Sequence, residues 1–397
     1  MTSLFGSSIT TADLERALQK ALGTEAKFGD RIEFEDLGGT QSHTVCLTVS
    51  WKPPDSSFPS KFVVKISGPK READKNPLTK LAQETMNRER EETLVKRQNN
   101  EIEILSRVKE ISPSVKVPEI LGYKKRRICE DTGFILLKYY ESSPNTAEDF
   151  CLSLSEVKQI IEQTAKIHKA GPLFSTEERK KLEGAPLQNL WILEPKPARY
   201  ALESIKNFGK TVLVKEVDLL EKVLGEMLDR DYIKFVDETC EHLGITRLLC
   251  HGDMWRGNML WKRTEENRID LQTIVDLEAV HFGCPLVDIA KILTCLLSTE
   301  VRREHWKCLV EYWMYCMGEE IAYTLEQAFE AFQRVLSIYC FNEAGCLAST
   351  AAWWIERMSD EENRVRLRQI VLEKLKGLVE DAVTFHKRNW EIFKALS

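Results

Sequence analysis

The sequence has no closely paired cysteines and no long apolar run. Its eleven cysteines stand singly, none of them in a Cys-x-x-Cys pair. A disulfide framework needs an even set of cysteines at framework spacings, so we expect free thiols in a reducing compartment. No stretch reaches the roughly 18 uninterrupted apolar residues of a membrane span, and residues 1–15 lack the basic and apolar regions of a signal peptide. The sequence therefore predicts a cytoplasmic protein without a membrane span.

The sequence also lacks an excess of basic residues. Lysine and arginine together number 56, against 62 aspartate and glutamate residues, which gives a formal net charge of −6. This balance argues against a nucleic-acid-binding protein. The short basic run YKKRR at Tyr123–Arg127 is best explained as a solvated turn or strand end, with an anion site as the lesser alternative. A zinc site is disfavoured, because its candidate ligands would have to converge around one tight turn. Those candidates are Cys240, His242, Cys250 and His251.

What the sequence does have is a change of pattern along the chain. With 397 residues it is long enough for about two domains or lobes. The first third is strand-like at residues 32–51, 61–67, 118–127 and 132–142, and a helix that Thr11 can cap is expected at residues 10–22. Residues 69–99 are densely charged, which is typical of a loop followed by a solvated helix, and a core-facing helical stripe follows at residues 99–108. From Leu154 onward apolar residues recur at helical spacing, so we predict a boundary near residue 140.

The most informative segment is LLCHGDMWRGNMLW at Leu248–Trp261, followed by VDLE after the next apolar run. It places Asp253, Asn258 and Asp276 in one compact polar set. Phosphoryl transfer requires a base for the attacking hydroxyl and cations that bridge the triphosphate oxygens. Asp253 suits the first task, and Asn258 with Asp276 suits the second, because Mg²⁺ prefers hard oxygen ligands. A purely structural role for Asp253 is the weaker alternative, since a carboxylate in an apolar stretch needs a partner or a task.

Two further charged residues can complete such a site. Lys65 lies in the strand-like run FVVKI, where a lysine can reach the phosphates, and Glu101 lies in the helical run NNEIEIL, where it can hold that lysine. Taken singly, Lys65 could be a solvent-facing strand residue and Glu101 a helix-surface charge, with Glu103 as its rival. We interpret His251 as an orienting residue rather than a metal ligand. Asp288 is interpreted either as an acid at a helix N-terminus or as a group that braces the catalytic loop, and not as a metal ligand.

HGDMWRGN and the later VDLE resemble the catalytic-loop and metal-binding motifs of the choline kinase and aminoglycoside phosphotransferase superfamily. The run from HGDMWRGNMLW to VHFGCPLVDIAKIL is especially similar to its CHK-kinase-like (ecdysteroid-kinase-like) branch, including the nematode proteins of that branch. FVVKI, NNEIEIL, VPEILGYKK and GFILLKYYE follow in the order that this fold requires. The resemblance implies an α+β, bilobal protein-kinase-like fold. Residues 1–140 would form a small antiparallel-sheet N-lobe that binds nucleotide, and residues 141–397 a larger, mainly helical C-lobe for catalysis and acceptor binding.

The resemblance also implies roles for single residues. ATP would bind between the lobes with Mg²⁺, and its γ-phosphate would pass to a hydroxyl of a small molecule, such as a steroid, choline-like or xenobiotic alcohol. Asp253 would be the catalytic base, and Asn258 and Asp276 would ligate Mg²⁺. Lys65 would contact the α- and β-phosphates and pair with Glu101. The other implied nucleotide-binding residues are Leu137, Lys138 and Tyr139 of the linker that faces the adenine, and Gly38 and Gly39 of the phosphate-covering loop.

Two departures from the family pattern limit what the resemblance implies. The loop DLGGTQSHTV contains only two glycines, so its phosphate contacts are hard to place. Leu277 and Glu278 follow Asp276 where protein kinases have Phe-Gly, which argues against an activation-loop-controlled protein kinase. The main alternative is a catalytically silent kinase-fold protein that binds a ligand or acts as a scaffold. Five aromatic residues of the helical lobe can wall the acceptor pocket: Trp255, Trp313, Tyr339, Trp353 and Trp354. Trp313 and one of Trp353 and Trp354 are better explained as core residues. The number of subunits is left open.

Overall fold

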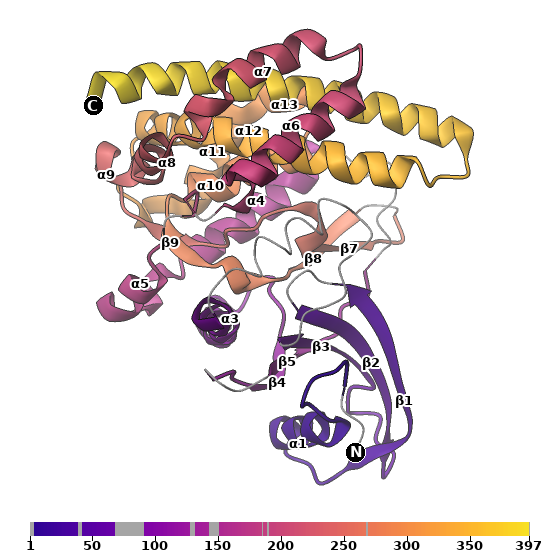
Figure 1. Cartoon of the computed structure of the whole chain (residues 1–397). Helices are drawn as coiled ribbons and strands as arrows, with labels where there is room; N and C mark the ends of the chain where they lie inside the picture. Colours follow the sequence, from indigo (N-terminus) through magenta and orange to yellow (C-terminus); the bar gives the residue numbers. More distant parts are fainter. Residues whose placement is uncertain are drawn as a thin grey trace.

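A strand-rich lobe and a helix-rich lobe meet end to end in the computed structural model of the chain (Figure 1). The structure describes residues 4–38, 42–67, 91–127, 132–142, 151–184, 186–188, 190–266 and 269–396. Gly39 and most of the charged segment 69–99 lie outside these residues. The predicted α+β architecture, with an antiparallel sheet in the N-terminal part and a mainly helical C-terminal part, is confirmed. The boundary at residue 140 stays a prediction.

The N-terminal lobe is built on a five-stranded antiparallel sheet with the strand order β1-β2-β3-β5-β4. Its strands are β1 (Lys27–Gly38), β2 (Ser42–Lys52), β3 (Lys61–Ser67), β4 (Ile120–Lys124) and β5 (Gly133–Lys138). In β3, Lys65 lies opposite Thr44 of β2 and Ile135 of β5. β3 is therefore the central strand, and its neighbours on both sides fix the position of Lys65.

Helix α1 (Thr11–Leu22) begins at a capping box, and its cap is Thr10. The Thr10 hydroxyl accepts the backbone N–H of Asp13, and the Asp13 carboxylate accepts the backbone N–H of Thr10. The expectation that Thr11 caps this helix was wrong by one residue, because the acid at the third helical position pairs with the residue three before it. Leu14 and Leu18 of α1 are fully buried against the sheet.

The two faces of the sheet have different neighbours, because successive side chains of a strand point to opposite faces. Phe62, Val64 and Ile66 of β3 belong to the core that the sheet shares with α1. Val63, one residue away, packs against a second core that includes α3 (Glu91–Ile111) and residues of the C-terminal lobe. Lys65 has the same parity as Val63. The alternation in FVVKI therefore turns its ammonium toward α3 and the C-terminal lobe.

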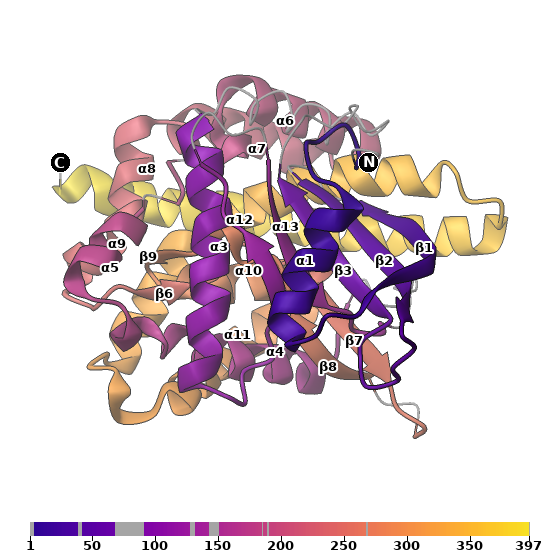
Figure 2. The ribbon, with the colours of Figure 1, turned by 90° about the horizontal axis from the view of Figure 1, so that it is seen from below.

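The C-terminal lobe is mainly helical, and its two longest helices form a hairpin on the side away from the sheet (Figures 1 and 2). The helices are α4 (Leu154–His168), α5 (Thr176–Leu182), α6 (Pro195–Gly209), α7 (Val214–Met227), α8 (Arg230–Asp237), α9 (Thr239–Leu243), α10 (Leu286–Leu296), α11 (Thr299–Met317), α12 (Leu325–Ile355) and α13 (Glu361–Leu396). One extended hydrophobic core runs through most of these helices.

Two small antiparallel strand pairs lie where the C-terminal lobe faces the sheet (Figure 1). β6 (Leu248–Cys250) pairs with β9 (His281–Gly283), and β7 (Met259–Arg263) pairs with β8 (Ile269–Ile274). The HGD segment follows β6 directly, and Asp276 follows β8. The strand ends therefore bring these two motifs to the junction of the lobes.

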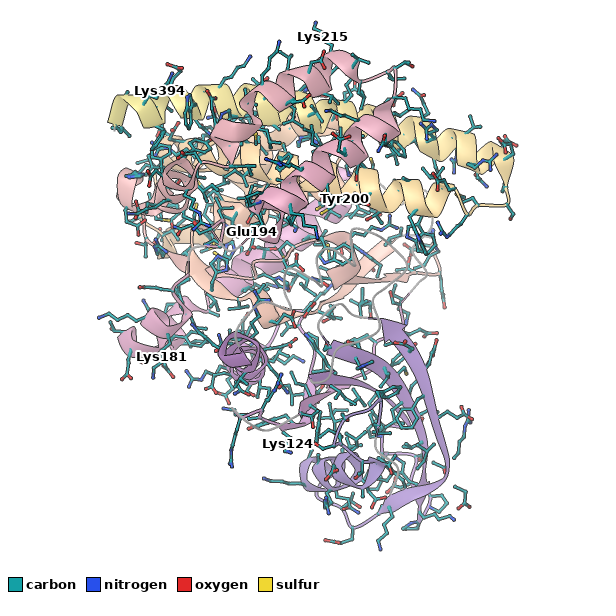
Figure 3. The ribbon with its side chains drawn as sticks, viewed as in Figure 1. Lys124, Lys181, Glu194, Tyr200, Lys215 and Lys394 are labelled. Carbon is teal, nitrogen blue, oxygen red and sulfur yellow. The ribbon has the colours of Figure 1, made fainter. Side chains whose placement is uncertain are left out.

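Charged side chains project from the surface of both lobes, as at Lys124, Lys181, Lys215 and Lys394 (Figure 3). The basic run at Tyr123–Arg127 begins at the end of β4, as expected, and Lys124 there is exposed. All ten cysteines that the structure describes are free thiols. Among the described residues, no helix combines the length and the apolar character needed to cross a membrane.

The sheet core generates the first prediction. Phe62 of β3 is fully buried, whereas Phe34 of β1 is 36% exposed. We expect Phe62→Ala to lower the free energy of unfolding by about 3–5 kcal/mol, because it removes a buried ring and leaves a cavity. The matched control Phe34→Ala should cost less than about 1 kcal/mol. Urea denaturation followed by circular dichroism measures both, and equal effects would contradict the assignment of the core face.

Candidate active site

Lys65 lies within hydrogen-bonding distance of three carboxylates. Its Nζ is 2.8 Å from Glu101 Oε2, 2.5 Å from Asp276 Oδ1 and 3.0 Å from Glu278 Oε2. Glu101 comes from α3, and the other two acids come from the segment around the short turn η5 (Leu277–Ala279) of the C-terminal lobe. The side chain of Lys65 is 11% exposed and that of Glu101 is 1% exposed. The structure therefore brings three predicted residues together and adds a fourth, Glu278.

Glu101 connects the two lobes through its two carboxylate oxygens. Oε2 accepts from Lys65, and Oε1 accepts the backbone N–H of Leu277 at 3.2 Å. Glu103, its rival in the sequence, is instead paired with basic residues at the surface. Two residues along a helix correspond to a rotation of about 200°, so these two acids lie on nearly opposite faces of α3 and only one of them can face the lysine. That acid is Glu101.

The cluster around Lys65 carries more negative than positive charge. Burial opposes the charge of Lys65, but Asp276, Glu101 and Glu278 together hold its pKa well above the usual value. Burial, together with the neighbouring Asp276, raises the pKa of Glu278 to about 7. For Asp276 the effect of burial is outweighed by Lys65, and its pKa falls. Three carboxylates around one ammonium form a set of hard oxygen donors with surplus negative charge, which suits a divalent cation.

Asp276 has a backbone conformation that few residues adopt. Its φ of 67° and ψ of 64° lie in the left-handed region. This conformation costs a residue with a Cβ roughly 1–2 kcal/mol, although aspartate tolerates it better than most. The hydrogen bond between Glu101 and the N–H of Leu277, together with the contact to Lys65, offsets that cost. The turn is thus held by the same charges that make up the site.

Asp253 lies in the loop between β6 and the turn η4 (Arg256–Asn258), and both of its carboxylate oxygens have a partner. Lys291 Nζ of α10 is 3.2 Å from Oδ1. Asn258 Nδ2 is 3.1 Å from Oδ2, and it also donates to the backbone oxygen of Asp253 at 2.9 Å. The side chain of Asp253 is nevertheless 36% exposed. It is therefore fixed in position and still open to a ligand.

His251 ties this loop to the strand that ends before Asp276. Its Nδ1 accepts the backbone N–H of Asp253 at 3.2 Å, so its proton sits on Nε2, which donates to the backbone oxygen of Val275 at 3.1 Å. The backbone N–H of Val275 in turn donates to the backbone oxygen of Asn258 at 2.8 Å. With both ring nitrogens in use, His251 orients the two motifs relative to each other.

Asp288, in the first turn of α10, anchors the backbone of the HGD segment. Its Oδ1 accepts the N–H of Gly252 at 2.8 Å, and its Oδ2 accepts the N–H of His251 at 2.7 Å. His168 Nε2 is 3.1 Å from the same Oδ2, while its Nδ1 accepts the indole N–H of Trp313 at 3.0 Å. Burial opposes the charge of Asp288, but the hydrogen bond from His168 and the loop N–H groups keep its pKa below the usual value. Asp288 is therefore an ionised, buried anchor.

Gly252 is required by the path of this loop. Its φ is +84°, and a Cβ at this position would lie 2.4 Å from the backbone oxygen of Ala279. Only glycine meets both conditions without strain. This explains the glycine between His251 and Asp253.

The other predicted nucleotide-binding residues lie around the end of β5 and at the end of β1. Leu137 is buried in the core that contains α3, and Lys138 is exposed, with its Nζ 3.5 Å from Glu119 Oε2. The ring of Tyr139 lies under Lys61, whose Nζ is 4.1 Å from the ring centroid. Gly38 ends β1, and Gly39 lies outside the described residues. The roles of these residues in nucleotide binding stay predictions.

Sequence reasoning missed two charged residues of the site, Lys291 and Glu278. Lys291 interrupts the apolar run IAKILTCLL and carries no motif of its own. The available signal was its spacing from Asp288, because residues three apart share a helix face. Glu278 was noted only as a difference from protein kinases, although two acids with one residue between them were a signal for a cation site.

The aromatic candidates for the acceptor pocket divide by exposure. Trp313 and Tyr339 are 0% and 3% exposed, and Trp313 serves as the hydrogen-bond donor to His168. Trp255 is 47% exposed, and its backbone N–H donates to the backbone oxygen of Asp253 at 3.0 Å. Trp354 is 61% exposed at the end of α12. Trp255 therefore belongs to the HGD loop itself and is exposed there.

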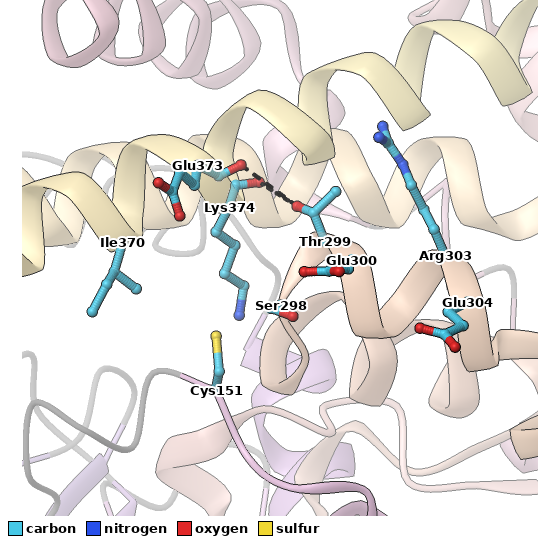
Figure 4. A pocket seen from close by; sticks show the side chains of 9 residues that line it. All are labelled: Cys151, Ser298, Thr299, Glu300, Arg303, Glu304, Ile370, Glu373 and Lys374. Atoms are coloured by element: carbon cyan, nitrogen blue, oxygen red, sulfur yellow. Dashed lines mark hydrogen bonds between the residues drawn. The ribbon is translucent and has the colours of Figure 1, made fainter.

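A cavity of about 660 Å³ lies between the N-terminal end of α11 and helix α13 (Figure 4). The side chain of Lys374 points down toward Cys151 at its edge (Figure 4). The lining residues are Cys151, Ser298, Thr299, Glu300, Arg303, Glu304, Ile370, Glu373 and Lys374. None of these residues carries a predicted catalytic role.

The Asp288 anchor generates the second prediction. Its pKa is lowered, so the stability that it contributes is fully present above the usual carboxyl pKa of about 3.9 and is lost as pH falls through its lower folded-state value. We expect Asp288→Asn to lower the free energy of unfolding by about 2–4 kcal/mol at pH 7. The difference from wild type should shrink as the pH falls toward about 3.5, as urea titrations at several pH values would show.

Asp237 provides the matched control. It is also buried and also accepts two backbone N–H groups, from Leu187 and Gln188, but burial raises its pKa to about 6. Its protonated form is therefore favoured by folding, and its contribution to stability falls as pH rises through about 6. The penalty of Asp237→Asn should thus be smaller at pH 7 than at pH 4.5. The same pH trend for both variants would contradict the assignment of Asp288 as an ionised anchor.

Comparison with known proteins places the chain among nematode relatives. The model of the family DUF1679, described as "Uncharacterized oxidoreductase dhs-27", matches residues 2–390. The Caenorhabditis elegans protein "Uncharacterized oxidoreductase dhs-27" is 24% identical over 253 residues, which cover 59% of this chain and 29% of that protein. The "Uncharacterized kinase-like protein D1044.1" of the same organism is 24% identical over 163 residues, which cover 38% of this chain and 42% of that protein. The chain thus spans less than half the length of either relative.

Solved structures with a similar course of the chain include small-molecule kinases. The Plasmodium vivax ethanolamine kinase has a TM-score of 0.46 at 14% identity, with 87% of this chain and 82% of that chain covered. The microcompartment-associated aminopropanol kinase has a TM-score of 0.48 at 13% identity, with 92% and 98% covered. The GDP complex of wild-type aminoglycoside 2'-phosphotransferase-IIIa has a TM-score of 0.43 at 12% identity, with 92% and 99% covered.

The kinship with nematode kinase-like proteins that the motifs predict is confirmed by these matches. Since the family model covers nearly the whole sequence, the chain belongs to the DUF1679 family.

Proposed function

We propose that the chain is an ATP-dependent phosphotransferase that moves the γ-phosphate to a hydroxyl of a small molecule. The observation that carries this proposal is that two clusters of charged and polar side chains are joined by hydrogen bonds from one short loop. Lys65 and its three carboxylates form the first cluster, and Asp253 with Asn258 forms the second. His251 and Val275 join the two through hydrogen bonds.

Asp253 has the properties of the base in this reaction. Its carboxylate is held from both sides by Lys291 and Asn258, yet more than a third of the side chain is exposed. Each carboxylate oxygen offers two lone pairs, so one contact per oxygen leaves room to accept the proton of an acceptor hydroxyl. A positioned base of this kind contributes about 10²–10⁴-fold to the rate.

The first cluster has the donor set that Mg²⁺ prefers. Asp276, Glu278 and Glu101 place carboxylate oxygens within 4.8 Å of one another. The amide of Asn258 donates through Nδ2, so its Oδ1 is the atom that can bind a cation. When bound, Mg²⁺ supplies the charge that neutralises phosphate oxygens. Lys65, held by Glu101, then has its ammonium placed for the phosphates of a nucleotide.

Two alternatives compete with this proposal. A catalytically silent ligand-binding or scaffold protein would keep the fold without needing Asp253. Here Lys291 and Asn258 hold the Asp253 carboxylate, while His251 and Asp288 hold the backbone of its loop through N–H groups. One relative is called an oxidoreductase, and an NAD(P)-dependent oxidoreductase would need a dinucleotide site. The sequence contains no Gly-x-Gly spacing, and the strands of the described sheets pair antiparallel throughout. Both features differ from the dinucleotide-binding pattern.

The third prediction tests the base. Asp253→Asn keeps the size of the side chain and its contact with Asn258 but removes the charge. We expect it to lower kcat for Mg-ATP turnover with a library of hydroxyl compounds by about 10²–10⁴-fold, with the Kd for ATP changed by less than about threefold. ADP release measures turnover, and calorimetry measures binding. Tight ATP binding with no turnover that depends on Asp253 would support the silent binding protein instead.

Lys65→Met should change the affinity for ATP rather than kcat alone. It removes the ammonium that reaches the phosphates, so the Kd for ATP should rise by about tenfold or more. Lys52→Met is the matched control, because Lys52 lies on the same sheet in an exposed pair with Asp30. An unchanged Kd in Lys65→Met would place the nucleotide elsewhere.

The fourth prediction tests the cation site. Asp276→Asn and Glu278→Gln each replace one carboxyl group of the cluster with an uncharged amide, so the Mg²⁺ concentration for half-maximal turnover should rise by about tenfold. Glu103→Gln, at the surface of α3, should leave it unchanged. A titration of ADP release with Mg²⁺ at saturating ATP measures this. Identical Mg²⁺ curves for all three variants and the wild type would remove Asp276 and Glu278 from the metal site.

A further inference from the structure

The base side of the site contains a second buried lysine. Lys291 is on α10, a helix that is otherwise apolar apart from Asp288 and Thr294. Its side chain is 13% exposed, and its Nζ lies 3.2 Å from Asp253 Oδ1. Although burial opposes the charge, Asp253 raises the pKa of Lys291 above its usual value. Lys291 is therefore a permanent positive charge beside the base.

A second acid and a second lysine lie behind this pair. The Oε2 of Glu343, on α12, accepts a hydrogen bond from the thiol of Cys295, with an Sγ–Oε2 distance of 2.8 Å. The charge of Glu343 also helps to raise the pKa of Lys291. Lys374 of α13 is 3% exposed and donates to the backbone oxygen of Cys295. Burial lowers the pKa of Lys374, and Glu343 is the main charge that opposes this. The two acids and the two lysines thus form one connected group.

At the base itself the charges are paired one to one, unlike in the cluster around Lys65, because Asp253 is matched by Lys291. An ammonium-bearing acceptor whose hydroxyl approaches Asp253 would bring its positive charge close to that of Lys291. Asp253 cannot attract this charge as a free carboxylate would, because Lys291 already neutralises it. Like charges brought together in a partly buried site disfavour binding.

We propose that Lys291 is a specificity-determining residue that makes the site reject ammonium alcohols and accept hydroxyl compounds without a positive charge. The inference rests on the proposed phosphotransfer to a hydroxyl. It assigns the charge class of the acceptor, whereas the proposed function leaves that class open. Lys291 comes from the helical lobe and contacts Oδ1 of Asp253, whereas Asn258 contacts Oδ2.

The test uses acceptors that differ in charge but not in shape. Choline and 3,3-dimethylbutan-1-ol form such a pair, because a carbon replaces the quaternary nitrogen. Ethanolamine and propan-1-ol form a smaller pair. Mass spectrometry detects the phosphorylated product, and kcat/KM is compared within each pair for wild type and variants. We expect the neutral member to be favoured by about tenfold or more in the wild type.

The variants separate charge from packing. Lys291→Gln should reduce the preference for the neutral member by about tenfold, because Asp253 then attracts an ammonium group. Lys291→Arg keeps the charge and should keep the preference. Lys374→Gln is the matched control, since it removes a buried lysine that does not contact Asp253, and it should change the ratio by less than about threefold. A ratio within each pair does not depend on how much active protein a variant yields.

The outcomes distinguish this inference from the proposed function. Turnover that depends on Asp253 but favours choline or ethanolamine in the wild type would overturn the inference alone. An unchanged ratio in Lys291→Gln would do the same. Wild-type protein that phosphorylates no member of any pair would count against the inference and the proposed function together.

Discussion

The site depends on one ion pair that the two lobes must share. Lys65 comes from the sheet, Glu101 from α3 and Asp276 from the C-terminal lobe. A carboxylate oxygen of each acid lies within 2.8 Å of Lys65 Nζ. A charged group that is buried without partners is costly, so removing Lys65 would leave Glu101 and Asp276 uncompensated. The relative position of sheet, helix and turn is therefore set by charge as well as by apolar packing. The left-handed backbone at Asp276 is tolerated because this pair holds it.

Asp288 and Asp253 have different tasks: Asp288 holds the backbone of the loop, and Asp253 is open to a ligand. Asp288 is fully enclosed and spends both oxygens on backbone N–H groups and His168, so it can hold the loop but cannot exchange a proton with a ligand. Asp253 has fewer contacts and remains partly exposed. Burial and hydrogen-bond count, rather than residue type, therefore separate the anchor from the candidate base.

The parts of the site that could be predicted from sequence are those fixed by local spacing. Alternation in FVVKI sets the face of Lys65, and the apolar stripe of α3 at Ile102, Leu105 and Val108 leaves Glu101 closer to the buried side than Glu103. The contact of Lys291 with Asp253 has no local cause, because it depends on how α10 packs against a loop 38 residues earlier in the chain. The helix cap, in contrast, has a local cause, since Asp13 stands three residues after Thr10 whereas Leu14 stands three residues after Thr11.

The two sides of the site differ in charge, and this difference has a consequence for what each side can bind. Around Lys65, three acids and one lysine leave negative charge that repels a triphosphate entering without a cation. At Asp253, Lys291 offsets the charge of the carboxylate, so a bound group there gains little from charge alone. Under the proposed function, the nucleotide and its cation would therefore be bound as one unit by electrostatics. A neutral acceptor would instead be held by shape and by hydrogen bonds, and Trp255 of the same loop offers an exposed apolar surface.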